Sequence, residues 1–279
     1  MREITDVAEL RETCADDQLC VWAAQDLGTT RAWVSDDGRA VAVAAPELSR
    51  WDRVALWGAP DAAAPLAMEV LDLVGPVFRP FGDPALIDAV IGAEPALESV
   101  ATFGWMGTTR TEHPGGWSRD GAEWLPASAD AEVAAFVDDV SPTSYALPGM
   151  PAVERWAGVR GDHGDLLAVG ALAWNAPSIG FLAGIMVDPA VRGRGLGRRV
   201  CELLLDESLR ERGSAALMVD AQNVAAIRLY EGLGLTYRDV RVAAIVGSPQ
   251  GGPDESVRPA GAVVPARRRT LSGSGSSGR

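Results

Sequence analysis

The stretch that most constrains the fold of this chain is residues 187–198, which read VDPAVRGRGLGR. Residues 179–187 are an almost uninterrupted apolar run, which is typical of a strand buried on both faces. Further along, apolar side chains recur at helical spacing, at Leu196, Val200, Leu203 and Leu204. The sequence therefore predicts a buried strand, a glycine-rich turn and a helix that begins at or near Gly195.

A glycine-rich turn that opens a helix is suited to bind an anion. The first amides of a helix have no partner within the helix, and the helix dipole makes this end positive. Glycine lets the backbone come close to a bulky phosphate and adopt positive φ, while arginine adds positive charge. The turn holds Arg192, Gly193, Arg194, Gly195, Gly197 and Arg198. The alternative interpretation is a tight turn with an ordinary helix entry.

Two known nucleotide-binding motifs do not fit this turn. The chain contains no lysine, so the Gly-Lys-Ser/Thr ending of a P-loop is impossible. The glycines are spaced by two residues throughout, whereas the dinucleotide fingerprint requires G-x-G-x-x-G. The pattern that remains is Arg192-x-x-Gly195-x-Gly197, which follows the tripeptide that begins at Val187.

This pattern resembles the pyrophosphate loop of the GNAT superfamily of acyl-CoA-dependent N-acetyltransferases, which reads Arg/Gln-x-x-Gly-x-Gly/Ala. A second block, residues 223–235, resembles the family's Asn-x-x-Ala-x-x-x-Tyr helix and the turn after it, with Asn223 and Tyr230 at the matching positions. The blocks stand in the family's order, with a strand-like run at residues 215–219 between them. The joint match covers residues 179–239.

The resemblance implies a fold, a co-substrate and a site. The fold would be α/β (α+β), with a mixed central sheet flanked by helices, and the co-substrate acetyl-CoA or another acyl-CoA, with no metal. The cofactor-binding positions that it implies are Ile185, Met186, Val187, Arg192, Gly193, Arg194, Gly195, Leu196, Gly197, Arg198 and Asn223. Tyr230 would be the catalytic general acid toward the leaving thiolate, and its alternative role is that of a core aromatic.

The sequence departs from the family where the chemistry needs a base. Many members carry a glutamate on the fourth strand, or on the fifth strand five residues before the asparagine. The matching positions here are Phe181 and Met218, and neither side chain can take a proton. Asp220 is the nearest candidate carboxylate, although a structural cap explains it equally well. A chain of water molecules is the other alternative.

The N-terminal residues 1–110 read as a second α/β unit. Their order of helix, three strands, helix, strand, helix, strand is that of the same fold, which predicts a tandem of two such domains. The equivalent turn, Gly58-Ala59-Pro60-Asp61, lacks the glycine pattern and the arginines. Its proline removes a donor and its aspartate would repel a phosphate. We interpret this unit as a degenerate copy that does not bind CoA; an unrelated α/β domain is the alternative.

Composition sets the expected limits of the two units. Residues 111–122 contain Pro-Gly-Gly and break the pattern, so we expect a linker there. The second unit would occupy residues 123–246, with its final strand at residues 243–246. Residues 247–279 turn to Gly, Pro, Ser and Arg without periodicity, which predicts a disordered tail.

Charge and composition also narrow the partners. The net charge of −13 argues against nucleic acid and mildly favours a cationic substrate such as an amine, although an ordinary acidic protein explains it as well. The first residues lack the apolar core of a signal peptide, and no apolar run could span a bilayer. We therefore expect a cytoplasmic protein without membrane contact. The three cysteines and two histidines show no metal-ligand spacing.

Three functions remain open at this point. The first is an N-acyltransferase that acts on an amine of a small molecule or a peptide. The second is a CoA-binding regulatory or inactive module, because the usual base is missing and the first unit is degenerate. The third is a tandem acetyltransferase of actinobacterial thiol biosynthesis, which combines a silent first half with an active second half. The sequence fixes neither the acceptor nor the oligomeric state.

Overall fold

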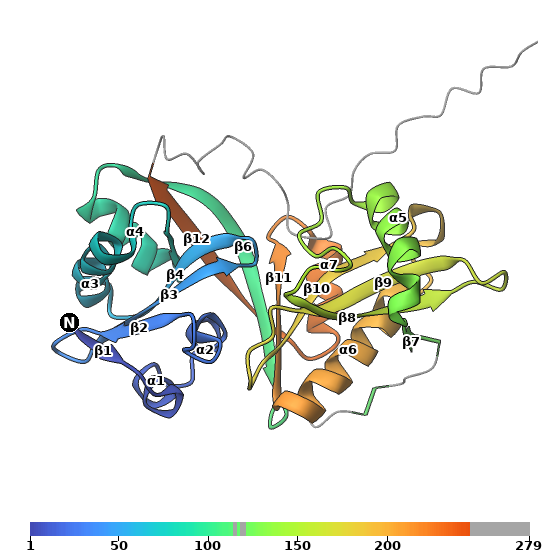
Figure 1. Ribbon diagram of the computed structural model, residues 1–279, viewed down its shortest axis with the longest axis horizontal. Helices are drawn as coiled ribbons and strands as arrows, with labels where there is room; N and C mark the ends of the chain where they lie inside the picture. Colours follow the sequence, from blue (N-terminus) through green and yellow to red (C-terminus); the bar gives the residue numbers. More distant parts are fainter. Residues whose placement is uncertain (114–115, 118–120, 246–279) are drawn as a thin grey trace, which may run out of the picture.

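The computed structural model of the chain describes residues 1–113, 116–117 and 121–245 (Figure 1). The strands of this part form one mixed sheet of 12 strands, in the order β1-β2-β3-β4-β5-β12-β6-β11-β10-β9-β8-β7. Their bounds are β1 Arg2–Ile4, β2 Arg31–Val34, β3 Ala40–Leu48, β4 Trp51–Gly58, β5 Arg79–Gly82, β6 Leu97–Thr109, β7 Glu123–Trp124, β8 Val153–Arg160, β9 Leu166–Ala173, β10 Gly180–Val187, β11 Ser214–Asp220 and β12 Thr236–Ile245. The expected disordered tail, residues 247–279, lies outside the described residues.

Helices cover both faces of the sheet. One face carries α1 (Val7–Thr13), α2 (Gln18–Ala24) and α5 (Asp130–Val140), and the other carries α3 (Pro60–Val74), α4 (Pro84–Ala93), α6 (Leu196–Arg212) and α7 (Val224–Glu231). Two 3-10 turns, η1 (Ala127–Ala129) and η2 (Pro189–Val191), precede α5 and α6. The strands supply apolar side chains to both faces: in β3, Val41 and Val43 pack under α2, and Ala42 and Ala44 under α3.

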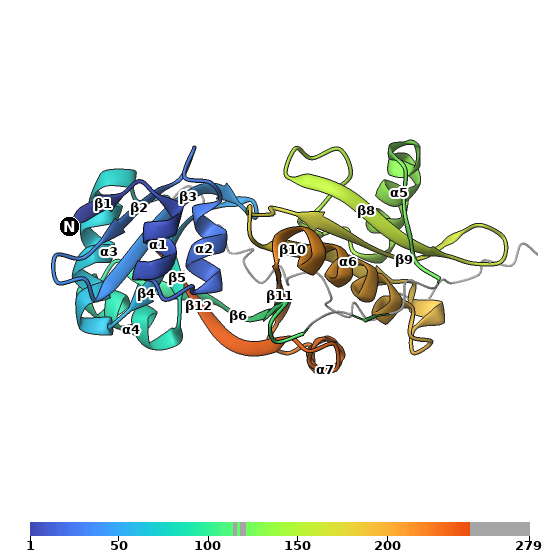
Figure 2. The same ribbon diagram turned by 90° about the horizontal axis from the view of Figure 1, so that it is seen from below.

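The two halves of the chain exchange their last strands. β12 comes from the C-terminal half but lies between β5 and β6 of the N-terminal half, and β6 lies between β12 and β11 (Figure 2). β6 and β12 run antiparallel from Thr236 opposite Gly107 to Ile245 opposite Leu97. Each half therefore completes its sheet with a strand of the other. The limits expected at residues 110 and 123 stay a prediction, since the sheet itself runs across them.

The sequence anticipated most of these elements, with three exceptions. β1 and β7 are edge strands of three and two residues, too short to produce a periodic pattern. β12 begins at Thr236, not at residue 243, because its first half is charged. Those charges are paired: Arg238 contacts Asp17 at 2.6 Å, and Arg241 contacts Asp88. Charged residues in a central strand thus concealed it from a reading of apolar runs.

An aromatic cluster joins the halves on the face covered by α1, α2 and α5. Trp22 of α2 stacks on Phe181 of β10 with ring centroids 4.5 Å apart, and Trp105 of β6 lies 5.8 Å from Phe181. The indole nitrogen of Trp22 donates to the carbonyl of Trp174 at 2.7 Å. All four side chains are buried. The N-terminal half therefore helps to fix the strand on which the candidate site is built.

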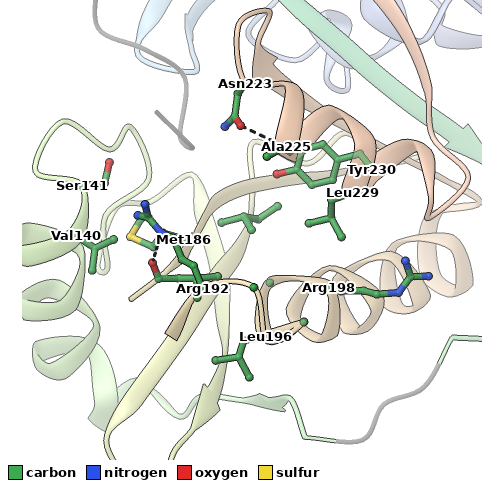
Figure 3. Close-up of a pocket in the computed structure, with 16 residues that line it drawn as sticks. Val140, Ser141, Met186, Arg192, Leu196, Arg198, Asn223, Ala225, Leu229 and Tyr230 are labelled. Carbon is green, nitrogen blue, oxygen red and sulfur yellow. Dashed lines mark hydrogen bonds between the residues drawn. The ribbon is translucent and has the colours of Figure 1, made fainter. Parts of the chain in front are cut away.

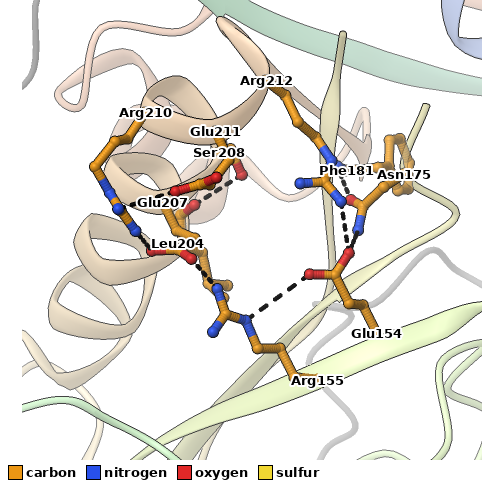
Figure 4. Close-up of polar contacts among 10 residues, drawn as sticks. All are labelled: Glu154, Arg155, Asn175, Phe181, Leu204, Glu207, Ser208, Arg210, Glu211 and Arg212. Atoms are coloured by element: carbon orange, nitrogen blue, oxygen red, sulfur yellow. Dashed lines mark hydrogen bonds and ion pairs between the residues drawn. The ribbon is translucent and has the colours of Figure 1, made fainter. Parts of the chain in front are cut away.

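A polar network fixes the C-terminal part of α6 on the sheet (Figure 4). Glu207 is only 7% exposed and accepts hydrogen bonds from Arg155 of β8 and from Arg210. Nearby, a Cβ on Gly180 would lie 2.2 Å from Oγ of Ser208, so glycine allows α6 to lie close on β10. Further contacts of the network join Glu154, Asn175, Phe181 and Arg212. These contacts hold α6 in place relative to β8 and β10.

Candidate active site

A pocket of about 360 Å³ lies where β10, α6 and α7 meet (Figure 3). It is lined by Val140, Ser141, Ile185, Met186, Val187, Arg192, Gly193, Gly195, Leu196, Gly197, Arg198, Asn223, Ala225, Ala226, Leu229 and Tyr230. The lining contains eleven of the twelve site residues that the sequence predicted. The twelfth, Arg194, is exposed and does not line the pocket. Two blocks about thirty residues apart in the sequence thus meet in one cavity.

Five lining residues were not predicted. Ala225, Ala226 and Leu229 belong to α7 and could have been found from helical spacing, since Ala226 stands four residues before Tyr230 and Ala225 four residues before Leu229. Val140 and Ser141 lie at the end of α5, far away in the sequence, and no motif marks them. Only the packing of α5 across β10 brings them to the pocket.

The pocket opens where two parallel strands separate. β10 pairs with β11 only through residues 180–182, opposite residues 215–217, although both strands continue for at least three residues more. The pairing of β10 with β9 contains a bulge, in which Gly184 has a φ of +60°. The peptide groups of residues 185–187 are therefore not paired with β11 and can hydrogen bond to a ligand.

The turn before α6 has the backbone geometry of an anion site. Gly193 and Gly195 have φ values of +80° and +78°, and the space beside each is open. Gly195 is the N-cap of α6 and offers no side-chain cap, so the first amides of the helix are not satisfied by a side chain. Arg192 donates from Nε to the carbonyl of Val187 at 3.2 Å, which ties the turn to the end of β10.

Gly197 and Arg198 line the pocket and also contribute to the packing of α6 against β10 and α7. A Cβ on Gly197 would lie 3.2 Å from Cγ2 of Val187, so glycine is needed where α6 passes β10. Arg198 pairs with Glu202 one turn later at 2.9 Å and donates to the carbonyl of Gly232 at 3.3 Å. Arg198 therefore joins α6 to the end of α7, and Glu202 offsets part of its charge.

α7 contributes Asn223 and Tyr230 from its two ends. Asn223 is the N-cap of the helix, and its side-chain oxygen accepts from the amide of Ala226 at 3.1 Å. The amide nitrogen of the same side chain lies at the rim of the pocket in Figure 3. The residue thus starts the helix in addition to facing the cavity, a capping role that the sequence interpretation did not assign.

Tyr230 is 4% exposed, and its hydroxyl points into the pocket (Figure 3). Burial raises the pKa of the Tyr230 phenol well above its ordinary value, and the thiol of Cys201 adds a smaller effect in the same direction. The phenol therefore carries its proton at neutral pH. Among the described residues the hydroxyl has no hydrogen-bond partner, so it is available to a bound ligand.

Among the described residues, no carboxylate or histidine side chain lines the pocket. Phe181 lies in the buried aromatic cluster, and Met218 packs half-buried against the same core. Asp220 accepts from the amide of Gln222 at 2.8 Å in the turn between β11 and α7, and it does not line the pocket. The lining supplies an acid in Tyr230 but no base.

The equivalent place in the N-terminal half differs at each of these points. All of β5 stays paired with β4, residues 53–56 opposite 79–82, so the strands do not separate there. α3 begins with Pro60, and Asp61 in its first turn accepts two hydrogen bonds from Arg39, at 2.8 and 3.0 Å. A hollow of about 690 Å³ exists beside this turn, but a carboxylate stands at its helix entry.

Within the described residues, no helix combines the length and apolarity required to cross a membrane. In the same part of the chain, His, Cys, Asp and Glu side chains do not gather in threes as a metal site would require. All three cysteines are buried, and burial raises the pKa of the Cys14 thiol to about 11 and of the Cys201 thiol to about 12. None of the three is a thiolate at neutral pH.

Comparison with known proteins agrees with this geometry. A family model described as Acetyltransferase (GNAT) family matches residues 116–235. A mycothiol acetyltransferase of Thermomonospora curvata is 35% identical over 138 residues, which are 46% of this chain and 44% of that protein. A ribosomal protein bS18 alanine N-acetyltransferase of Salmonella typhimurium is 38% identical over 90 residues, 32% of this chain and 60% of that protein. The chain thus spans less than two thirds of the length of these curated relatives.

Solved structures extend the likeness to the whole sheet. A GCN5-related N-acetyltransferase from Kribbella flavida has a TM-score of 0.54 and 17% identity, and covers 84% of this chain and 93% of its own. Residues 116–235 of this chain are a domain of the acetyltransferase (GNAT) family.

Proposed function

We propose that this chain is an N-acetyltransferase that transfers an acetyl group from acetyl-CoA to an amine of a small molecule or a peptide. The observation that carries this is the meeting, in one pocket, of the unpaired segment of β10, the uncapped start of α6 and the hydroxyl of Tyr230. Each would meet a different requirement of acyl transfer: the segment of β10 would bind the acyl arm, the start of α6 would bind the phosphates, and Tyr230 would donate a proton.

The residues present fit acetyl-CoA. The amides of residues 193–198 would hold the pyrophosphate, since Gly193 and Gly195 leave open space there and no side chain caps the helix. The peptide groups of residues 185–187 would bind the pantetheine arm and the thioester carbonyl. Apolar side chains such as Met186 and Leu229 would exclude water around the arm.

When bound, acetyl-CoA supplies a thioester whose carbon–sulfur bond is exchanged for a carbon–nitrogen bond to the amine. Tyr230 is placed to give its proton to the departing sulfur, so that CoA leaves as a thiol. The proton that the amine loses goes to water, and the phenol recovers its own proton from water. We assign the part of the base to solvent, since no carboxylate or histidine of the described part of the chain lines the pocket.

We infer further that the N-terminal half binds no CoA. Its strands β4 and β5 stay paired, and Asp61 stands where a phosphate would approach the start of α3. The intact chain is expected to bind one equivalent of CoA in a calorimetric titration. A stoichiometry of two would contradict this, and so would binding that survives the loss of the turn before α6.

The deciding experiment measures thiol release from acetyl-CoA over a panel of amines, with CoA affinity measured in parallel by calorimetry. Thiol release that depends on one class of amine supports the proposal that the chain is an N-acetyltransferase. Binding of CoA without turnover on any amine favours the alternative of a binding or regulatory module, which the missing base makes worth testing. Absence of CoA binding would overturn both.

The names of the relatives suggest two arms for the panel. The mycothiol acetyltransferases among the relatives keep open a role in actinobacterial thiol biosynthesis, with a small-molecule amine as the acceptor. The alanine N-acetyltransferases among them suggest peptides with an N-terminal alanine. Turnover on one arm and not on the other would decide between a small-molecule and a peptide acceptor.

A further inference from the structure

Arg53 on β4 is a buried cation outside the pocket described above. It is 5% exposed, and its Nε donates to the carbonyl of Leu48 at 3.2 Å. Its guanidinium carbon lies 5.2 Å from the ring centroid of Phe81. Among the described residues no carboxylate forms an ion pair with Arg53. A buried charge without a counter-ion is costly, so a structural role alone does not account for it.

A second guanidinium stands beside the first. Arg79 of β5 is the register partner of Arg53 in the parallel pairing and is 2% exposed. It stacks on Trp51, with 3.6 Å between the guanidinium carbon and the ring centroid. Burial, and to a lesser degree repulsion by Arg79, lowers the pKa of Arg53 to about 10, while the phenol of Tyr145 acts in the opposite direction. Two adjacent buried cations form a place where an anion would be stabilised.

These arginines lie at the edge of the sheet where β10 and β11 end, and Arg53 lies on the face that carries Phe181. Through the antiparallel pairs of β6 with β11 and β12, and of β12 with β5, the strands β4 and β5 run opposite to β10 and β11. Arg53 and Arg79 stand at the beginning of their strands, hence at the edge where β10 and β11 end. Arg53 shares its face with Ala55, which belongs to the same core as Phe181.

The loop after α5 connects the two places. The indole nitrogen of Trp51 lies 3.4 Å from the hydroxyl of Tyr145, and Arg50 donates to the carbonyl of Ser144 at 3.4 Å. The next residue, Ala146, lies at the bulge of β10, 3.4 Å from where a Cβ of Gly184 would be. In Figure 1 the hairpin of β3 and β4 reaches toward the centre of the molecule, where the C-terminal half begins. The loop thus runs from the arginines to the segment that would hold the thioester.

We propose that the acceptor amine carries a carboxylate, and that Arg53 binds this carboxylate while the amine faces the separated strands β10 and β11. Arginine presents a planar pair of donors that matches a carboxylate, and the buried setting makes the ion pair strong. Such a substrate supplies the counter-ion that Arg53 lacks among the described residues. This rests on the proposed acetyltransferase function and names its class of acceptor.

The test uses the intact chain with saturating acetyl-CoA and matched pairs of acceptors. L-amino acids and dipeptides are each compared with their carboxamides, and phosphoethanolamine with ethanolamine. We expect kcat/KM to be at least about tenfold higher for the acids than for the amides. Arg53→Met should reduce that ratio to near one by lowering kcat/KM for the acids, leave CoA affinity unchanged, and keep or raise Tm, because it removes an unpaired buried charge. Arg53→Lys should retain part of the preference.

Arg31→Met is the matched control, since Arg31 is an exposed arginine of the same half that pairs with Glu3 at 2.8 Å. Its preference for acids should equal that of the wild type. Equal turnover of acids and amides, a preference that survives Arg53→Met, or a preference for phosphoethanolamine alone would overturn the carboxylate assignment and leave the acetyltransferase in place. Absence of turnover with every acceptor would overturn the proposed function together with this inference.

Discussion

Gly184 of β10 lies directly against the indole of Trp156: a Cβ on Gly184 would come within 2.8 Å of Cη2 of that ring. Gly184 also has a φ of +60°, a conformation that side chains other than glycine rarely adopt. Trp156 is 4% exposed and belongs to β8, so it has little room to retreat. The bulge that parts β10 from β11 therefore depends on a residue with no side chain.

Gly184→Ala is expected to destabilise the protein and to impair acetyl transfer. The left-handed backbone costs about 1–2 kcal/mol for alanine, and the contact with Trp156 adds to it. A loss of 2 kcal/mol lowers Tm by roughly 4–8 °C in a chain of this size. Calorimetry and kcat/KM are the measurements.

Gly92→Ala is the matched control, because Gly92 is an exposed residue of α4 with no neighbour near a built Cβ. Alanine there should leave activity unchanged and raise stability by about 0.5–1 kcal/mol. If both variants behave alike, the bulge is not what holds the strands apart.

Gly195→Asp should abolish CoA binding and leave the fold intact. The new side chain projects where the pyrophosphate approaches, and its charge repels the phosphates. The φ of Gly195 is +78°, which aspartate and asparagine adopt more readily than other side chains, and the space beside it is open, so circular dichroism should remain native. Gly195→Asn has the same shape without the charge and isolates the electrostatic part. We expect the Asp variant to lose more than about tenfold in affinity, roughly 1.4 kcal/mol, and the Asn variant to lose less. An Asp variant with nearly normal affinity would contradict the assignment of the turn.

Tyr230→Phe separates a catalyst from a core aromatic. If the hydroxyl protonates the leaving thiolate, kcat should fall on the order of 10²-fold or more, with CoA affinity nearly unchanged. If the side chain only packs, the rate should not change, and stability should change by less than about 1 kcal/mol, because the hydroxyl has no hydrogen-bond partner among the described residues. Tyr237→Phe removes a hydroxyl that donates to Asp239 at 2.8 Å on the neighbouring β12, and it should leave kcat unchanged.

The raised pKa of Tyr230 also predicts a pH profile. A general acid acts in its protonated form, so its activity is lost as the pH rises through its pKa. Because burial places that pKa well above the ordinary value of 10.0, Tyr230 should cause no decline in kcat below pH 10. A decline near neutral pH that disappears in Tyr230→Phe would contradict the direction of this shift.

Glu207→Gln tests the network that holds α6. Burial opposes ionisation of Glu207, but hydrogen bonds from Arg210 and Arg155 outweigh it and lower the pKa of the carboxyl below 4.5. A lowered pKa adds stability above pH 4.5 that is lost as the pH falls. The variant should therefore lose about 1–3 kcal/mol at pH 7, and the difference should shrink below pH 4. Glu211→Gln, an exposed partner of Arg210, should cost less than about 1 kcal/mol at either pH.

The sequence predicted which residues meet in the pocket because its motifs are local. The proposed anion site consists of consecutive residues of one turn, and Tyr230 follows Asn223 by two turns of one helix, so spacing alone brings both to the same side. Val140 and Ser141 escaped prediction because they reach the pocket only through the packing of α5. The sequence also did not point to Arg53 as a binding residue. Its proposed role depends on the strand register that places it beside Arg79 and on the loop that carries Tyr145.

The fold was predicted where apolar periodicity is strong and missed where it is absent. The two-residue β7 and the charged first half of β12 carry no such pattern. The exchange of β6 and β12 could not be foreseen either, because strand order is a property of long-range pairing and leaves no mark on local sequence. The prediction of two similar units in tandem is consistent with the sheet, in which each unit borrows one strand.

The exchange of last strands has a consequence for synthesis. While the nascent chain emerges, β5 and β6 wait side by side with the place of β12 empty, and both present unpaired edges until residues 236–245 leave the ribosome. The N-terminal half is thus synthesised first, but its part of the sheet is completed only when β12 has been synthesised. A chain that ended between α7 and β12 would contain the whole N-terminal half, yet β5 and β6 would keep unpaired edges with which another strand could pair.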